Sequence, residues 1–227
     1  MTDNGDDCIP YEGADRINFS IITKQMRCLP LLEDDLFLGM QAMNVGLVDS
    51  IITDYEYGLL NEYLEFDKTP GQYAMTVSAM SQMWVYGLYE VLRMWRDRIY
   101  HFRELHRKGG IVSKLKDMPS DDPYNFTIRT RILQLKRFKE DPAYRETIDS
   151  AWNRIEPVYR MVELFRMNLA KHCAPGKDGV MPQAPGYGRI NMLCGAMDFE
   201  LVDKVGSYYL MNRRDIADKL RRALSAC

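Results

Sequence analysis

The sequence predicts a mainly helical protein, an up-down bundle of about four long helices that carries a small C-terminal β-hairpin and one further helix. Long stretches have apolar residues at spacings of three and four, and Pro, Gly or Asn stands where these stretches begin and end. Strand-like patterning is confined to about residues 190–211. We expect an N-terminal arm over residues 1–30, a helical bundle over residues 31–172, and a loop, hairpin and helix over residues 173–227.

Composition limits the class of protein. The 227 residues are 46% hydrophobic and 27% charged, and the formal net charge of −2 gives no strong field for nucleic acid or membrane. Five cysteines without CxxC spacing indicate reduced thiols and a cytoplasmic protein. We recognise no signal peptide and no run of about 18 apolar residues, so we expect no membrane contact.

Residues 72–107 carry the strongest helical signal. Their apolar stripe consists of Val77, Met80, Trp84, Leu88, Val91, Trp95, Ile99 and Phe102. Pro70 and Gly71 mark the start of this stretch, and Gly109 and Gly110 follow its last turn, where glycine ends many helices. At ~1.5 Å per residue the helix is roughly 50 Å long and needs partners of similar length.

The preceding stretch, residues 31–66, predicts another long helix. Its periodic apolar residues are Leu36, Met40, Met43, Leu47, Ile51, Tyr55, Leu59 and Tyr63. Gly39, Gly46 and Gly58 weaken this helix and favour a kink or a close crossing with another element. Residues 17–22 could form a short strand, but the weakly patterned first 30 residues favour an arm along the surface.

Two further helices follow. Residues 125–139 have helical apolar spacing, and Pro123 marks a helix start before them. Asp141 and the proline after it repeat this signal before the fourth helix, which continues as the long run of residues 149–172. Pro157 lies inside this helix and predicts a kink or a break, because proline lacks an N–H and crowds the preceding turn.

The C-terminal part has a different composition. Residues 173–189 are rich in Pro and Gly and form a candidate lid or docking loop. Residues 190–202 and 207–211 predict the two strands of a hairpin. Asn212 then caps a closing helix, with Asp215 in the capping-box position.

The three histidines lie near the C-terminal ends of the predicted long helices, His101 and His106 in the second and His172 in the fourth. Histidine is the side chain whose ordinary pKa lies close to neutral pH. In an up-down-up-down bundle the second and fourth helices run parallel, so their C-terminal ends lie together. We therefore expect His106 and His172 to converge there with Arg166.

Two Arg–His pairs resemble the Arg-x4–6-His motif of HEPN-domain proteins, which are helical and often dimeric prokaryotic ribonucleases. Arg96 and His101 have four residues between them and a polar residue after the arginine, and Arg166 and His172 have five. The resemblance implies metal-independent RNA cleavage, or RNA or nucleotide binding, in a bacterial defence or toxin–antitoxin system. In that chemistry a histidine acts as general acid or base and an arginine holds the phosphate. Residues 169–190 also resemble bacterial proteins without an assigned function.

Helical geometry ranks these candidate catalytic residues. Arg166 and His172 border the core-facing stripe of their helix, so we assign them the main roles, with His106 and Arg96 as the opposing pair. His101 is the reserve, because it shares a polar face with acidic residues of its own helix, as in a solvated ladder. The alternative for each histidine is a structural role, as a buried or helix-capping imidazole.

Other chemistry is not predicted. There is no Gly-rich phosphate loop and no Glu-x-x-His pair of a di-iron bundle, so we expect no cofactor and no metal. The alternative to a ribonuclease is a non-enzymatic helical protein-interaction module, whose contact surfaces are the N-terminal arm, the loop around Tyr187 and the hairpin. The long apolar stripes and the aromatic-rich first helix predict a homodimer, with RNA or another protein as further partner.

Basic residues are concentrated near the C-terminus, where we find Arg213, Arg214, Lys219, Arg221 and Arg222. Such a helix face can bind an acidic partner or nucleic acid. On an amphipathic helix it is more often a solvated surface, and we expect it to be solvated here.

Overall fold

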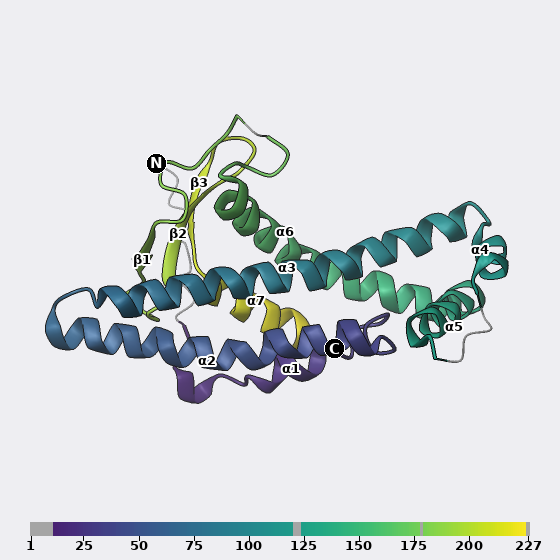
Figure 1. Cartoon of the computed structure of the whole chain (residues 1–227), viewed down its shortest axis with the longest axis horizontal. Helices are drawn as coiled ribbons and strands as arrows, with labels where there is room; N and C mark the ends of the chain where they lie inside the picture. The colour runs from purple at the N-terminus through teal and green to yellow at the C-terminus, as the bar shows by residue number, and fades with distance from the viewer. Residues whose placement is uncertain (1–10, 120–123, 178, 226–227) are drawn as a thin grey trace, which may run out of the picture.

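The computed structural model describes residues 11–119, 124–177 and 179–225, and it is mainly helical, as the sequence predicts. After a 3-10 turn (Ala14–Arg16), its helices are α1 (Ser20–Gln25), α2 (Leu36–Phe66), α3 (Gly71–Arg107), α4 (Ile111–Asp117), α5 (Phe126–Glu140), α6 (Pro142–Lys171) and α7 (Arg213–Ser225). The long packed helices are α2, α3 and α6, while α4 and α5 lie at one end of the molecule (Figure 1). The third helix of the predicted bundle, α5, is therefore a short one.

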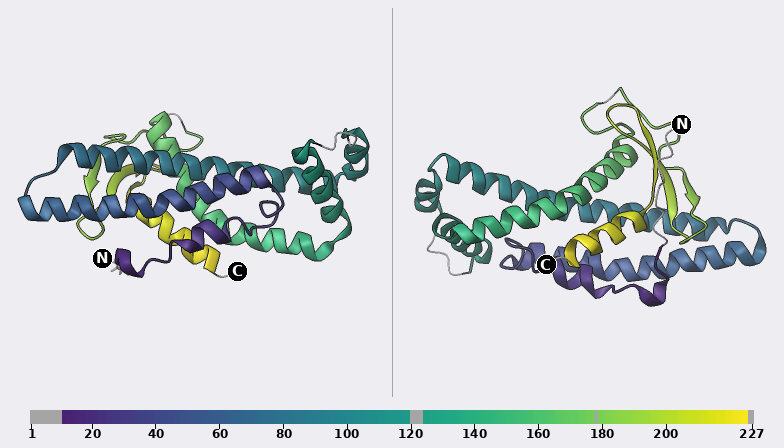
Figure 2. Two further views of the ribbon diagram at one scale, coloured as in Figure 1. Left: turned by 60° about the horizontal axis from the view of Figure 1, so that its bottom comes forward. Right: turned by 180° about the vertical axis from the view of Figure 1, so that it is seen from behind.

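α2 and α3 form an antiparallel hairpin. Trp84 Nε1 donates a hydrogen bond to the carbonyl oxygen of Val45 at 2.9 Å, and the rings of Tyr55 and Tyr73 lie 5.5 Å apart. α6, α7 and the sheet lie behind this pair in Figure 1, and Figure 2 shows them in front when the molecule is seen from behind. The opposite side of the α2–α3 pair carries no other ribbon of the described chain (Figure 1).

α6 packs along α3 in the opposite direction. Arg103 pairs with Asp149 at 2.5 Å near the end of α3, whereas Tyr89, further back on α3, stacks on Tyr159, with 6.0 Å between ring centroids. The prediction that these two helices run parallel is therefore wrong. The physical reason is that α4 and the short α5 stay at the end of the bundle, so α6 begins where α3 finishes.

Helix caps follow the sequence signals in part. The side chain of Asp141 accepts a hydrogen bond from the backbone N–H of Tyr144 at 3.0 Å, so the predicted start of α6 is confirmed. Asn125 caps α5 in the same way, while the start signal at Pro123 lies outside the described residues. Pro157 does not break α6, which continues on both sides of it.

The C-terminal sheet has three antiparallel strands in the order β1 (Gly188–Ile190), β2 (Met197–Val202) and β3 (Tyr208–Met211). A turn divides the single strand predicted over residues 190–202, and this turn needs a glycine. Gly195 has a φ of +74°, and a Cβ there would lie 1.8 Å from the carbonyl oxygen of Glu56 on α2. The predicted capping box is confirmed, since Asn212 and Asp215 exchange hydrogen bonds of 2.9 and 3.0 Å at the start of α7.

The segment before α2 belongs to the core. Residues 20–25 form α1 and not a strand, and Ile22 and Met26 are fully buried, so this part is not an arm along the surface. The reason is that α1 crosses α2 closely at Gly46. The sequence predicts a kink or such a crossing at the glycines of this helix. A Cβ on Gly46 would lie 2.5 Å from the backbone nitrogen of Thr23.

Candidate functional site

The predicted Arg–His residues do not converge within one chain. His106 is on the last turn of α3, where its ring lies edge-on to Phe138 of α5, 5.8 Å between centroids. His172 is the exposed C-cap residue of α6, with a left-handed φ of 54°. Because α3 and α6 are antiparallel, His106 lies near the start of α6, and His172 is roughly 40 Å away along that helix. The expected meeting of His106, His172 and Arg166 at one end is therefore wrong.

The two predicted arginines are already engaged inside the protein. Arg96 donates a hydrogen bond to the hydroxyl of Tyr159 and pairs with Asp97 at 2.8 Å. The guanidinium of Arg166 lies over the ring of Tyr89, 5.0 Å from its centroid. A guanidinium that is paired with a carboxylate has fewer donors left for a phosphate, so Arg96 is not a free anion ligand.

His101 lies where α3 meets α4 and α5. Partial burial, together with the positive charges of Lys114 and Arg131, holds the pKa of His101 below its ordinary value of 6.5. Burial also lowers the pKa of Arg131, to about 10. The predicted polar ladder on α3 is present as well, since Arg93 pairs with Asp97 at 3.5 Å. His101, Lys114 and Arg131 together form a small basic cluster at this end of the molecule.

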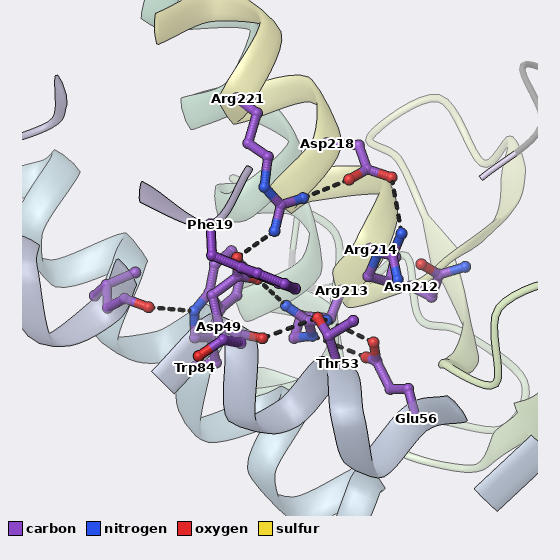
Figure 3. Close-up of polar contacts among 12 residues, drawn as sticks. Phe19, Asp49, Thr53, Glu56, Trp84, Asn212, Arg213, Arg214, Asp218 and Arg221 are labelled. Atoms are coloured by element: carbon purple, nitrogen blue, oxygen red, sulfur yellow. Dashed lines mark hydrogen bonds and ion pairs between the residues drawn. The ribbon is translucent and has the colours of Figure 1, made fainter. Parts of the chain in front are cut away.

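A buried charge network connects α7 to α2 (Figure 3). Arg213 donates from Nε and Nη2 to the two carboxylate oxygens of Glu56, at 2.8 and 2.5 Å, and from Nη2 to the hydroxyl of Thr53 at 2.9 Å. Arg213 also pairs with Asp49, whose other oxygen accepts from Arg221. Arg213, Asp49 and Glu56 are completely buried, so the network is part of the protein interior.

The expectation of a solvated basic face on the last helix is therefore wrong for most of its members. Arg213 and Arg214 are 0% exposed and Arg221 is 6% exposed. Burial disfavours a charged guanidinium, but Glu56 and Asp49 outweigh this effect and raise the pKa of Arg213. The sequence did contain a signal, because Asp49 and Glu56 are seven residues apart and so lie on one helix face, the face that α2 buries.

The network determines which side of α2 faces solvent. With Asp49 and Glu56 turned inward, the core side of α2 is formed by Leu38, Ala42, Val45, Ile52 and Leu59. The opposite side is also apolar but exposed, with exposed fractions of 39–58% at Leu36, Phe37, Met40, Leu47, Val48 and Ile51. From residue 36 to residue 53, a fully described stretch, the one charged residue is Asp49, which is buried. This exposed side therefore carries no charge over about five helical turns.

A groove of about 520 Å³ runs beside this exposed side, between α2 and α3. It is lined by Gln41, Asn44, Val45, Val48, Met80, Met83, Trp84, Gly87, Glu90 and Val91. A Cβ on Gly87 would meet, among the described atoms, only Val45 at 3.9 Å, so packing within the chain does not require glycine there. We use the name "α2–α3 face" for the exposed side of α2 and this groove, with Leu36, Phe37, Met40, Leu47, Val48, Ile51, Met83 and Gly87.

The sequence expectation that no stretch is apolar enough to span a membrane does not hold for α2, which is, among the described residues, the helix that is long and apolar enough to cross one. In the folded chain 44% of its most apolar window is buried against other parts of the protein. Moving α2 into a bilayer would separate Asp49 and Glu56 from Arg213. That separation would leave these buried charges without their partners, which is costly in free energy.

A second groove, of about 620 Å³, lies between α6 and the loop that follows it. It is lined by Arg160, Glu163, Leu164, Met167, Pro175, Gly176, Asp203 and Lys204. The predicted lid or docking loop thus contributes Pro175 and Gly176, but the charges in this groove are of both signs and give it no clear preference for an anion. Among the described residues, no group of three or more His, Cys, Asp or Glu side chains is positioned to hold a metal ion.

Comparison with known proteins gives no match to a family model, to a curated protein or to a solved structure. The chemistry of the chain's own surfaces therefore has to identify its function. In the part of the chain that the structure describes, the α2–α3 face and the basic cluster around His101 are the surfaces whose chemistry suggests a function.

Proposed function

We propose that the protein is a non-enzymatic helical interaction module that binds its partner through the α2–α3 face. The observation that carries the proposal is that α2 is apolar on both sides, while the described chain covers only one of them. A helix that is apolar all round is normally buried all round. Contiguous exposed apolar patches on folded proteins mark sites of protein or membrane interaction.

The face also specifies the chemistry of its partner. Because it exposes no charge between residues 36 and 53, a charged group buried against it would lose its hydration without gaining a counter-charge. The partner surface must therefore be apolar, and the burial of apolar area favours the complex against the entropy that is lost on association. Gln41, Asn44 and Glu90 line the groove beside the apolar stripe and supply the polar border that interfaces usually have.

The buried charge network supports the same role. α2 cannot rotate about its axis to bury the stripe, because rotation would pull Asp49 and Glu56 away from Arg213. The stripe is thus held outward in one orientation. A surface fixed before binding loses little conformational entropy when the partner arrives.

Site-specific photo-crosslinking in cells tests this proposal. A photoreactive amino acid at Ile51 is expected to give a discrete protein adduct. The same amino acid at Leu133, an exposed apolar position on α5, is the matched control and is expected to give none. The absence of any adduct at both Ile51 and Leu47 would contradict the proposal, and an adduct with lipid alone would replace the protein partner by a membrane.

A second candidate function, the HEPN-like ribonuclease, is supported by the basic cluster at the end of α3. A histidine with a lowered pKa is neutral at pH 7 and can accept a proton, and the nearby cations Lys114 and Arg131 can bind a phosphate. The cluster favours His101 as the acting histidine over His172, which is the exposed C-cap residue of α6. RNA binding would then use the end formed by α3, α4 and α5.

Cleavage of single-stranded RNA in EDTA tests this second candidate. The rate is expected to fall by about 10²–10⁴-fold in His101→Ala, the usual contribution of a general acid or base. His172→Ala is the control and is expected to retain the wild-type rate. Wild-type protein that cleaves no RNA would remove the ribonuclease from consideration.

A further inference from the structure

We infer that the occupant of the α2–α3 face is a second copy of this chain, which contributes its own α2–α3 face about a two-fold axis. The inference rests on the proposed function, because it names the partner of the same surface. Its support comes from the shape, the size and the charge of that surface, and from Gly87.

The face has the two parts that a self-complementary surface requires, a row of exposed side chains and a groove. Met40, Leu47 and Ile51 form a ridge on the exposed side of α2, and the groove between α2 and α3 runs directly beside it. In a two-fold contact one surface must supply both sides of the interface. The ridge of the first copy can enter the groove of the second, and the ridge of the second can enter the groove of the first. Packed helices fit their side-chain ridges into grooves in the same way.

The size of the face suits a stable dimer. A buried Phe, Tyr or Trp side chain accounts for roughly 150–250 Å², and the Leu, Ile and Met side chains of the face are at the lower end of that size. The half-exposed apolar residues of the face therefore present on the order of 600–800 Å², close to the ~800 Å² per partner of a standard protein–protein interface. The face can therefore supply most of a standard interface.

Gly87 gives independent support. Glycine weakens the interior of a helix relative to alanine, so a glycine in the middle of α3 needs a reason. Two of the three glycines of α2 have such a reason within the chain, since a Cβ at Gly46 would meet Thr23 at 2.5 Å and a Cβ at Gly58 would meet Tyr73 at 2.4 Å, whereas the nearest atom to a Cβ at Gly39 would be 3.4 Å away. Gly87 has no such contact among the described residues. The close approach of another helix to the groove supplies the missing reason.

Charge argues against the other occupants. α2 contains no Lys or Arg, and its exposed residues further along include Asp54, Glu62 and Glu65, which an anionic membrane surface would repel. The first ten residues of the chain, MTDNGDDCIP, would bring three aspartates onto an uncharged surface. A second copy instead offers the same apolar surface, whose α2 side exposes no charge between residues 36 and 53.

The molar mass of the purified full-length chain tests the inference, measured by sedimentation equilibrium from about 1 to 100 µM, the range of ordinary protein association. Wild type is expected at twice 26.5 kDa. Ile51→Asp and Gly87→Leu, which bury a charge and fill the groove, are each expected to weaken the dimer by about 100-fold or more. Leu133→Asp, an exposed apolar position away from the face, is the control and is expected to leave the dimer intact.

The outcomes separate this inference from the proposed function. A monomeric wild type overturns the dimer, but a photo-adduct at Ile51 with a different protein would then preserve the interaction module. A dimer that neither Ile51→Asp nor Gly87→Leu weakens also overturns the inference, because its contact lies elsewhere. If Ile51→Asp loses its helical circular dichroism, Gly87→Leu decides alone. A monomer without any photo-adduct overturns both proposals.

Discussion

Arg213 of α7 and Glu56 of α2 form a bidentate ion pair across 157 residues of sequence, with nitrogen–oxygen distances of 2.8 and 2.5 Å in the fully buried interior. The pair joins the last helix of the chain to the helix that carries the α2–α3 face. The stability of the fold and the orientation of the face therefore depend on the same contact.

Replacing Arg213 by Met is expected to destabilise the protein strongly. The buried carboxylates of Asp49 and Glu56 would both lose their ion pair with Arg213, and Asp49 would keep only its pair with Arg221. Removing one partner of a buried ion pair costs about 3–5 kcal/mol, measured as the free energy of unfolding in urea. Arg222→Met, an exposed change on the same helix, is the matched control and should cost less than about 0.5 kcal/mol. Equally small effects for both variants would show that the network contributes little.

Alanine at two helix glycines should have effects of opposite sign. Gly46→Ala places a Cβ 2.5 Å from the backbone of Thr23, so α1 must shift, and a loss of about 1–3 kcal/mol is expected. Gly87→Ala meets only an ordinary contact and should stabilise the chain by about 0.5–1 kcal/mol. Both are measured by urea unfolding in the Ile51→Asp background, so that association does not contribute. Equal losses of unfolding free energy at the two positions would show that the space around Gly87 is not open.

The titration of His101 should reflect its basic surroundings. Its pKa is lower in the folded state than the ordinary 6.5, so the unfolded state takes up the proton first as the pH falls. Stability is therefore lost as the pH drops from about 6.5 to the folded pKa. An NMR titration of the imidazole measures the pKa, and Lys114→Gln should raise it while Lys219→Gln should not. A wild-type pKa at or above 6.5 would contradict the cluster.

Helix positions could be predicted because their signals are local. The spacing of apolar residues, the cap at Asp141 and the capping box of Asn212 and Asp215 are each encoded within a few neighbouring positions. The direction of α6 relative to α3 could not be predicted, because it depends on where α4 and α5 place the start of α6. The burial of Arg213 was missed because its carboxylate partners lie on α2, far away in the sequence.

The candidate site was harder to predict than the fold. The spacing of Leu47 and Ile51 identifies a helix, but it does not say which side of that helix packs inward when both sides are apolar. Asp49 and Glu56 decide the side, and they do so only because α7 neutralises them in the interior. The Arg–His motif is likewise local, whereas the convergence of His106 and His172 depended on helix direction.

The central claim of this account is that the α2–α3 face is covered in the cell. The most direct measurement is the rate at which maleimide labels an Ile51→Cys variant, in cells and in dilute purified protein. Leu133→Cys is the exposed reference, and Cys8, Cys28 and Cys227 are first replaced by Ser. The account predicts that Ile51→Cys reacts much more slowly than Leu133→Cys in cells and at a similar rate in dilute solution. Similar rates at the two positions in cells would contradict it.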